Sequence, residues 1–511
     1  MRGIGFCLLA ALLSLALAAC GPGDPTVSNG PPGVVPPERQ EITQVGPGGV
    51  ARLELPLEPG CLNPYLRECE GAAALSGVIL ESPLAVVGDG RYRPYLMESL
   101  PSFESGTLSE NPFTVTYRLR SGVRWSDGEP LTSGDAAWTY RQARELGDGL
   151  APPYAGWSEL ERVETPDART VRLTFSAPRS DWRTLLTAPI LPRHVYEGRD
   201  LGELPLSEGL LGSGPFVLEE RTPEGMWLVR NENYWADEEL PLLDGLEIRF
   251  GGPAAGALAA GQADFGVLGS RRAGEVEVMG DVQTAPAAAA VEQLLFDTGR
   301  LSDPRLRRAV AHAIDREALA RKTGGLEVAN GLFPPGMSRY HAPAWEEYAH
   351  DPALARRLAR AAGAAGSLEI IYPAGDERLQ EMAGGVARDL EAAGISARVR
   401  GVPARELALK MLPGAFDLAL LRFEARRDGS LALHAPYSRS EALGESLREL
   451  DVGRRARLVR EAQEEMAEEL AVLPLVVRRD VLAWSNALYG PRPETPVQSV
   501  LWNVREWGFY R

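Results

Sequence analysis

The stretch FTVTYRLRSGVRWSDGEPLTSGDAAWTY, residues 113–140, contains the local signals that decide the fold. Apolar and polar residues alternate over residues 113–119, and this period of two predicts a strand with one buried face. The turn sequence Ser-Asp-Gly follows at residues 126–128, where glycine can adopt a positive φ. Thr132 stands three residues before Asp135, a capping-box spacing that predicts the start of a helix. The stretch therefore predicts a strand, a tight turn and a capped helix, without a catalytic group.

The same stretch resembles a signature of the solute-binding proteins of ABC importers, in the extracellular family that binds peptides, oligopeptides and nickel. Residues 119–136 follow the family pattern Leu-Arg-x-Gly-Val-x-Trp/Phe-x-Asp-Gly-x-Pro-x-Thr-Ala-x-Asp-Val, except that Ser-Gly-Asp-Ala replaces Ala-Glu-Asp-Val at its end. Further blocks resemble the family in the same order along the chain. They are residues 192–195, 211–216, 230–235, 241–250, 258–264, 302–317, 331–335 and 502–509.

The run SDPRLRRAVAHAIDRE, residues 302–317, is very similar to the family's most recognisable helix. The Asp-Pro pair at its start suits a helix cap and first turn. Apolar residues at helical spacing mark one face, and Arg305, Arg307 and Arg308 mark the opposite, polar face. We expect His312, beside the apolar face, to pack rather than to bind a ligand.

From residue 351 onward, helical patterns alternate with apolar strands, which predicts a mostly parallel sheet covered by helices. The resemblance spans residues 46–511. It implies an α/β, two-lobed periplasmic-binding-protein-like fold of type II, in the large cluster with an extra subdomain, hinged by two chain crossings. It places lobe I at residues 46–285 and 480–511, and lobe II at residues 286–479.

The first residues predict export. An apolar run ends in Leu-Ala-Ala before Cys20, so residues 1–19 are expected to be a signal peptide, too short to span a membrane comfortably. The ending resembles a bacterial lipobox, in which Cys20 is lipidated and becomes the mature N-terminus; the alternative is an ordinary signal peptide with an incidental cysteine. Residues 20–45, rich in Gly and Pro, are then a lipid-anchored flexible tether. We expect the protein on the outer face of the cell membrane or in the periplasm.

Composition narrows the class of protein. The net charge of −16, with 44% hydrophobic residues, is typical of a soluble acidic protein long enough for more than one domain. Positive charge is not clustered for phosphate contacts, so no nucleic-acid partner is expected. In an exported chain, Cys61 and Cys69 predict a disulfide. A two-cysteine metal site is the alternative, but no histidine lies nearby in the sequence.

The resemblance also implies a binding site between the lobes. In peptide-binding members, an acidic residue of lobe II near an aromatic pairs with the amino terminus of the ligand. Here Phe423 is the aromatic, and Arg426 stands where the carboxylate is expected. Glu424 or Asp428 could substitute, whereas a cation at this position favours anionic ligands.

Lobe I supplies further candidates. The resemblance brings the loop at Leu62 and Asn63 toward the cleft, and Tyr154 and Trp157 could stack on a ligand or simply pack within the lobe. The candidate ligand-binding residues are Leu62, Asn63, Tyr154, Trp157, Arg422, Phe423, Glu424, Arg426 and Asp428.

Motifs of catalysis are missing from the sequence: it has no His-Glu-x-x-His pair and no Gly-x-Ser-x-Gly elbow. We therefore expect no enzyme, no metal site and no cofactor. The resemblance implies a monomeric solute-binding lipoprotein that delivers a peptide or similar small solute to the permease and ATPase subunits of an ABC importer. The alternatives are a receptor for an oligosaccharide, an anionic conjugate or a nickel chelate, and a cell-surface sensor on the same scaffold.

Overall fold

The computed structural model describes residues 44–511, apart from residues 57, 60, 67–68, 70–71, 76, 88–90, 148–149, 205–209, 237–240, 270–271, 273–275, 277–279, 326, 364–365, 412, 427 and 493–499. The expected signal peptide, the lipidation site Cys20 and the tether as far as residue 43 lie outside the described residues. Within these described ranges, no helix combines the length and apolar character that crossing a bilayer requires.

Residues 113–140 fold as predicted from the sequence. β6 (Phe113–Arg118) buries every second side chain. α1 (Ser133–Leu146) begins after Thr132, whose backbone N–H and hydroxyl both donate to the Asp135 carboxylate at 2.8 Å. The capping box therefore fixes the start of the helix, and β6 and α1 contribute side chains to the same hydrophobic core.

This core, called core I below, contains side chains from Ala51 to Ala287 and again from Leu482 to Trp507. β5 (Leu108–Glu110), β6, β8 (Thr170–Phe175) and β7 (Leu160–Asp167) form a four-stranded sheet, and β3 (Leu84–Val87) pairs with β4 (Arg91–Pro94). The helices that contribute to core I include α1, the 3₁₀ helix η3 (Pro152–Glu159), α2 (Trp182–Leu185) and α3 (Arg193–Tyr196). The disulfide expected from the sequence is confirmed: Cys61 and Cys69 are bonded, with Cα atoms 4.9 Å apart.

The second large core, core II, contains side chains from Leu294 to Val476. Its helices are α6 (Pro304–Ala313), α7 (Arg316–Thr323), α8 (Pro352–Ala361), α9 (Glu377–Ala392), α10 (Ala404–Lys410), α11 (Glu441–Ser446) and α12 (Val452–Glu469). They accompany β15 (Leu368–Pro373), β16 (Ala397–Val402) and β17 (Leu418–Glu424), of which β15 is parallel to both neighbours. The predicted helix–strand alternation is confirmed.

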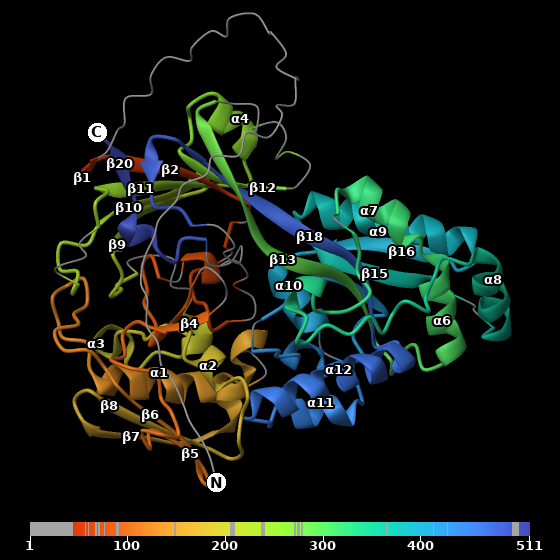
Figure 1. Ribbon diagram of the computed structural model, residues 1–511, viewed down its shortest axis with the longest axis horizontal. Coiled ribbons are helices and arrows are strands. Elements are labelled where there is room, and N and C mark those ends of the chain that lie inside the picture. The colour runs from red at the N-terminus through yellow and green to blue at the C-terminus, as the bar shows by residue number, and fades with distance from the viewer. Residues whose placement is uncertain are drawn as a thin grey trace, which may run out of the picture. The chain divides into compact units, whose positions relative to one another are not determined.

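Two long antiparallel strands join the cores, β13 (Val282–Phe296) and β18 (Val472–Ser485) (Figure 1). Their pairing runs from Val282 opposite Ser485 to Leu295 opposite Val472, with register shifts after Pro286 and after Glu292. β12 (Phe265–Leu268) extends the sheet from β18 into core I, and β17 extends it from β13 into core II. The two expected chain crossings fall within these strands, while the exact lobe boundaries stay predictions.

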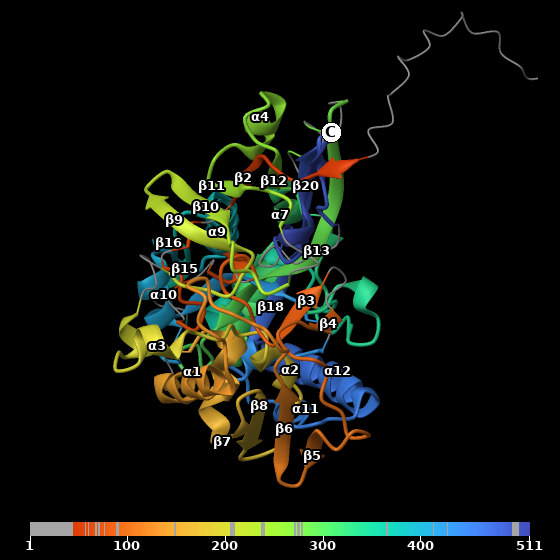
Figure 2. The same ribbon diagram turned by 90° about the vertical axis from the view of Figure 1, so that its left-hand side faces the viewer.

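The sheet continues in core I from β12 through β2 (Val50–Leu55), β11 (Gly245–Phe250) and β10 (Gly225–Arg230) to β9 (Phe216–Thr222). β14 (Glu327–Val328) adds to β18, and α4 (Ala254–Ala259) packs beside β12. β1 (Val45–Gly46), β20 (Gly508–Tyr510) and β19 (Leu488–Tyr489) form a separate three-stranded sheet. Figure 2 shows the same elements after a quarter turn about the vertical axis.

The stretch 302–317 departs from the sequence prediction in two ways. It forms two helices, because α6 ends at Ala313 and α7 begins at Arg316. Arg307, expected on a polar face, is buried and donates to the carbonyls of Leu301 and Glu469. An arginine can be buried in this way because its aliphatic stem packs while its guanidinium is satisfied by carbonyl oxygens.

Arg316 connects α7 with three other chain segments of core II. Its guanidinium donates to the carbonyls of Ala329, Pro474, Trp345 and Tyr348 at 2.8–3.2 Å. The burial lowers the pKa of Arg316 to about 10. The side chain therefore supplies donors that these buried carbonyls would otherwise lack.

We predict that Arg316→Ala lowers the free energy of unfolding by about 3–5 kcal/mol, because it leaves several buried acceptors without donors. Urea unfolding followed by tryptophan fluorescence measures the loss. Arg321→Ala, on the exposed face of α7, is the matched control and should change stability by less than about 0.5 kcal/mol. Equal effects of the two variants would contradict the role given to Arg316.

A buried carboxylate fastens the C-terminal segment to core I. Glu81 accepts hydrogen bonds from the Tyr234 hydroxyl at 2.8 Å and the Trp235 indole at 2.6 Å. Arg505 donates to the same Tyr234 hydroxyl at 3.3 Å and lies 4.7 Å from the ring of Tyr95. Burial raises the pKa of Glu81 to about 7, although the hydrogen bonds oppose this shift.

This pKa predicts a pH dependence of stability. Between pH 4.5 and about 7 the unfolded chain has ionised Glu81 while the folded protein keeps it protonated, so stability falls as the pH rises. The total loss should be about 3 kcal/mol. Glu81→Gln should remove this part of the slope in chemical denaturation from pH 4.5 to 8, whereas Glu98→Gln, at the surface, should preserve it. An unchanged slope in Glu81→Gln would refute the assignment.

Candidate ligand-binding site

Asp428, just after β17, links core II to core I. Its Oδ2 accepts hydrogen bonds from the Tyr92 hydroxyl of β4 at 2.7 Å and from the Thr184 hydroxyl of α2 at 2.9 Å. Its Oδ1 accepts from the backbone N–H of Ser430 at 3.0 Å. The carboxylate is buried, so these donors replace the water that it would otherwise bind. We call the contact between Tyr92, Tyr154, Glu159 and residues 179–187 of core I and residues 424–426, 428–430 and 447–455 of core II the seam.

Arg426 lies in the seam with its charge partly compensated. Its Nη1 donates to the Thr184 hydroxyl at 3.2 Å. Burial lowers its pKa, but the neighbouring Tyr92, Asp428, Tyr154 and Glu424 outweigh this effect, so the net shift is upward. The guanidinium therefore stays cationic and faces side chains from both cores.

Glu424 ends β17 beside two guanidiniums. Its burial raises its pKa, while Arg422 and Arg426 oppose that rise. A carboxyl with a raised pKa can bind a cationic group as a carboxylate or donate a hydrogen bond as an acid. The seam thus contains both a cation and a titratable acid.

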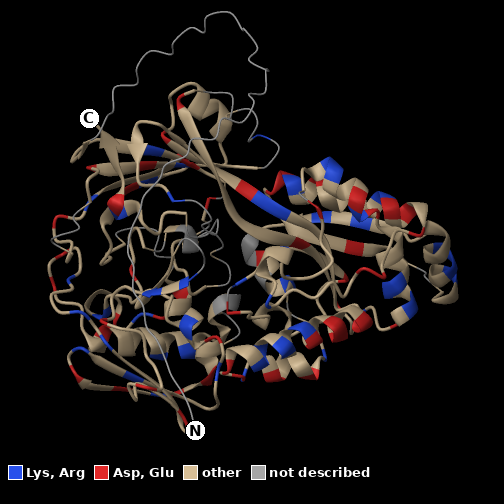
Figure 3. Cartoon of the chain, in the orientation of Figure 1, with Lys and Arg blue, Asp and Glu red and all other residues tan. Residues whose placement is uncertain are grey.

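The charges beneath the seam, at the crossing strands, are compensated. Glu292 of β13 is fully buried and bonded to Arg378 at 2.8 Å and to Arg478 at 3.4 Å. Arg478 also binds Asp480 at 2.6 Å, and Arg422 lies 3.8 Å from the same carboxylate. Figure 3 shows these acidic and basic segments together on β13 and β18. Each buried cation here has an acidic partner within 4 Å.

A second set of contacts closes the seam near α11. The backbone N–H of Ser180 donates to the carbonyl of Leu447 at 2.8 Å. Arg448 binds the Glu159 carboxylate, which also pairs with Arg179 at 2.9 Å. Burial alone would raise the pKa of Glu159, but the two guanidiniums bring it below its ordinary value. The two cores are therefore joined by the Arg448–Glu159 ion pair as well as by Asp428.

Residues 91–437 match the family described as bacterial extracellular solute-binding proteins, family 5, middle region. This match covers more than half of the chain, and it includes the residues on both sides of the seam. The protein belongs to family 5 of the bacterial extracellular solute-binding proteins. The family consists of binding proteins rather than enzymes.

Known relatives of this solute-binding protein resemble it over most of its length. Protein XP55 of Streptomyces lividans is 29% identical over 371 residues, which are 67% of this chain but just under two thirds, 65%, of that relative. The glutathione-binding protein GsiB of Salmonella paratyphi A is 26% identical over 441 residues, covering 76% of this chain and 82% of that one.

The fold is shared with solved structures. The oligopeptide-binding protein AppA from Bacillus subtilis, in complex with a nonapeptide, superposes with a TM-score of 0.79 at 18% identity. The superposition covers 92% of this chain and 100% of AppA. The two-lobed α/β class predicted from the sequence is confirmed, with cores I and II as the interiors of the two lobes.

Among the predicted site residues, the structure brings Tyr154, Glu424, Arg426 and Asp428 together at the seam. Arg422 belongs to the charge network beneath it. Phe423 is buried against Phe333 and His434, and thus supports the seam from within core II. Contact of any of these with a ligand stays a prediction.

The other candidates lie inside core I. Trp157 has no exposed surface and stacks on Tyr140 with ring centroids 4.3 Å apart, the packing alternative weighed from the sequence. Asn63 is buried and donates to the carbonyls of Leu201 and Leu204 at 3.0 and 2.9 Å. Its amide therefore holds two loops together in this structure.

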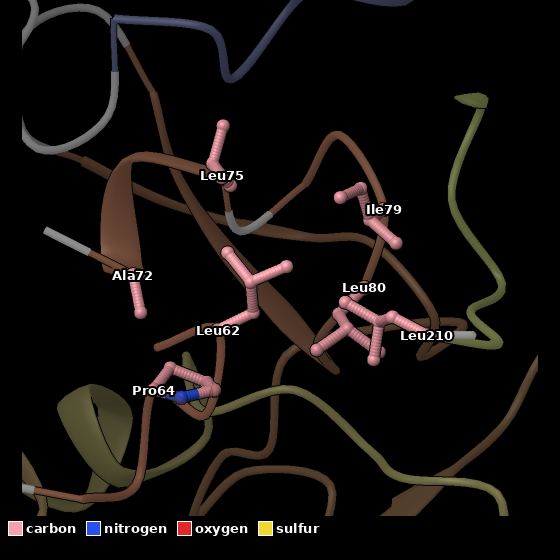
Figure 4. A pocket seen from close by; sticks show the side chains of 7 residues that line it. All are labelled: Leu62, Pro64, Ala72, Leu75, Ile79, Leu80 and Leu210. Carbon is pink, nitrogen blue, oxygen red and sulfur yellow. The ribbon is translucent and has the colours of Figure 1, made fainter. Parts of the chain in front are cut away.

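Leu62 lines a small apolar cavity rather than the seam. Figure 4 shows its side chain with those of Pro64, Ala72, Leu75, Ile79, Leu80 and Leu210 around the cavity. The volume of about 10 Å³ would hold at most one water molecule. This cavity is too small for a solute. Among the described residues, no three His, Cys, Asp or Glu side chains are grouped to hold a metal ion.

Tyr92 and Thr184 are seam residues that the sequence argument missed. Each belongs to a short element of core I, and its partner Asp428 is more than two hundred residues away in the chain. No local pattern signals such a contact. Only the sheet topology, which returns β17 to the crossing strands, brings these side chains together.

We predict that Tyr92→Phe weakens the seam, because Asp428 loses one of the donors that satisfy its buried charge. Hydrogen bonds to charged groups contribute about 1.5–3 kcal/mol, so the lobes should separate in a larger fraction of molecules. Small-angle X-ray scattering should then show a larger radius of gyration than for the wild type.

Tyr117→Phe is the matched control, because its hydroxyl bonds only within core I, to Tyr140 at 2.8 Å. It should lower thermal stability without changing the scattering. If Tyr92→Phe scatters like the wild type, the Tyr92–Asp428 hydrogen bond does not hold the lobes together.

Proposed function

We propose that this protein is an extracytoplasmic solute-binding lipoprotein that captures a peptide or similar small solute between two lobes and delivers it to an ABC importer. Membership of family 5 supports the binding role. Lobe I would comprise residues 46–285 and 480–511, and lobe II residues 286–479. The lipid anchor at Cys20, the monomeric state and the permease and ATPase partners belong to this proposal.

The observation that carries the proposal is the seam. Tyr92 and Thr184 from core I, and Glu424, Arg426 and Asp428 from core II, form one polar cluster between two separately packed cores. A solute that binds between the lobes would replace or join these hydrogen bonds. Its binding would therefore shift the equilibrium between separated and joined lobes.

The charges of the cluster favour a solute with an anionic group. Arg426 stays cationic, and Asp428 has its oxygens occupied by three donors. Glu424 can receive the amino group of the same solute. A short peptide with a free amine and a carboxylate fits this arrangement, and the relative named as a glutathione-binding protein supports the same class.

A non-peptide ligand, such as an anionic conjugate, is the second candidate. The observation that favours it is Arg426 at the position where the resemblance expects a carboxylate. Such a ligand would need Arg426 but not Glu424. The two candidates therefore differ in which substitution abolishes binding.

We predict that Arg426→Gln weakens binding of an anionic peptide by about 10- to 100-fold, the value of one or two lost charge-assisted hydrogen bonds. Glutathione is the first probe, and di- to pentapeptides follow. Isothermal titration calorimetry on the chain lacking residues 1–19 measures the affinities. Native mass spectrometry of the same sample identifies any solute that copurifies.

Arg398→Gln, whose side chain is 65% exposed on β16, is the matched control and should bind as the wild type does. Glu424→Gln distinguishes the candidates: it should weaken peptides with a free amine and leave amine-free conjugates unaffected. Unaltered peptide binding in Arg426→Gln would exclude Arg426 from the site. A lack of binding to every peptide tested would refute the peptide proposal.

A further inference from the structure

Arg183 is a cation of the seam without an acidic partner. It lies on α2, after Trp182 and before Thr184 in the chain. Its guanidinium lies 4.4 Å from the centre of the Trp182 ring. Within the described residues it makes no hydrogen bond or ion pair. The nearby carboxylate, Asp428, already accepts from Tyr92, Thr184 and Ser430. The donors of Arg183 are therefore unused.

Arg455 is a second such cation, on the other side of the seam. It lies in the first turns of α12, is only 3% exposed, and donates through Nη1 to the carbonyl of Glu449 at 3.2 Å. Its buried Nε has no hydrogen-bond partner among the described residues. An unsatisfied donor on a buried charge is costly. The positive end of the α12 dipole adds to the cationic potential here.

The contacts of the seam place both arginines at the boundary between the cores: Arg455 donates to the carbonyl of Glu449, and the next residue, Leu450, packs against core I. Ser180, three residues before Arg183, donates to Leu447, and Thr184 donates to Asp428. α2 and the residues just before it thus make two contacts with core II. Burial lowers the pKa of Arg183, and the charge of Arg455 lowers it further, while Tyr92 and Asp428 oppose the shift only in part.

The arrangement differs from the charge network at the crossing strands. There, Arg378 and Arg478 share the carboxylate of Glu292. At the seam, Arg183 and Arg455 come from opposite lobes and repel each other. An oxyanion between them would satisfy donors on both and change the repulsion into an attraction across the lobes.

We propose that Arg183 and Arg455 together bind one oxyanion, a carboxylate or phosphate group, which bridges the two lobes. This oxyanion site adds a contact group to the proposed binding function. It rests on that function only where the oxyanion is taken to be part of the captured solute. The group could also be a free inorganic anion. Both sources have the same chemistry at the guanidiniums, and the experiment separates them.

The first test uses inorganic phosphate as the probe, on the chain lacking residues 1–19, in phosphate-free buffer. Calorimetry should show saturable binding by the wild type. Arg183→Gln and Arg455→Gln should each weaken this binding by about tenfold or more. The double variant should lose little beyond the larger single effect, because the two side chains hold the same anion.

Arg457→Gln, exposed on α12 two residues after Arg455, is the matched control and should bind phosphate as the wild type does. Thermal stability provides a second readout. Without phosphate, Arg455→Gln should melt no lower than the wild type, because it removes an uncompensated buried charge. With phosphate, the melting temperature should rise in the wild type and in Arg457→Gln but not in the two seam variants.

Competition then separates the two sources. If the oxyanion belongs to the solute, phosphate should compete with glutathione and both seam variants should weaken glutathione binding. If the oxyanion is free, phosphate and glutathione should bind together, and phosphate should strengthen glutathione binding by bridging the lobes. Either result supports the site.

The proposal is overturned if the wild type does not bind phosphate, or if Arg183→Gln and Arg455→Gln bind it as well as the wild type does. These outcomes are independent of peptide binding. If phosphate binding depends on both arginines but no peptide binds, the peptide function fails and the oxyanion site stands. If peptides bind and phosphate binding is insensitive to both arginines, the oxyanion site fails and the peptide function stands.

Discussion

The antiparallel pairing of β13 with β18 is the constraint on which the rest of the structure depends. Each strand gives one half of its length to core I and the other half to core II, so both lobes share a continuous sheet. Of the two register shifts in this pairing, the one after Pro286 lies between the two halves. A change in the relation of the lobes must therefore bend or twist these two strands together.

The buried charges at this crossing limit how far such a bend can go. Glu292 is bonded to arginines on β18 and α9, and separating a buried charge from its partner costs about 3–5 kcal/mol. The network should therefore move as a unit with core II. The seam is different, because its contacts include single hydroxyl–carboxylate bonds and cations with unused donors. Contacts of that kind can be exchanged for a ligand at lower cost.

The sequence predicted those features that depend on neighbouring residues. The capping box of Thr132 and Asp135, the alternation in β6 and the helix–strand order after residue 351 are local, and the structure has them. The interpretation of residues 302–317 was wrong where tertiary contacts override the local pattern. Arg307 turns inward because the distant carbonyl of Glu469 and the nearby carbonyl of Leu301 satisfy its guanidinium.

In the candidate site, too, the sequence predicted what depends on neighbouring residues and missed what depends on contacts between distant segments. Arg426 stood out from the sequence because of its place relative to Phe423, and it lies at the seam. Tyr92, Arg183 and Thr184 could not be found, because nothing in a short strand or a one-turn helix reveals which side chain will meet a residue of the other lobe. Trp157 illustrates the converse: an aromatic in a Gly- and Pro-rich loop can serve either a ligand or a core, and only burial distinguishes the two.

The pairing of the chain's two described ends has a consequence for biogenesis. β1 pairs with β20, Val45 opposite Tyr510, and core I includes residues after Leu482. Core II, in contrast, is built from one uninterrupted stretch. A chain that emerges with its N-terminus first can thus complete core II while core I still lacks its closing strand. The first lobe to appear is the last to be finished, and until then its apolar strands lack the partners that bury them.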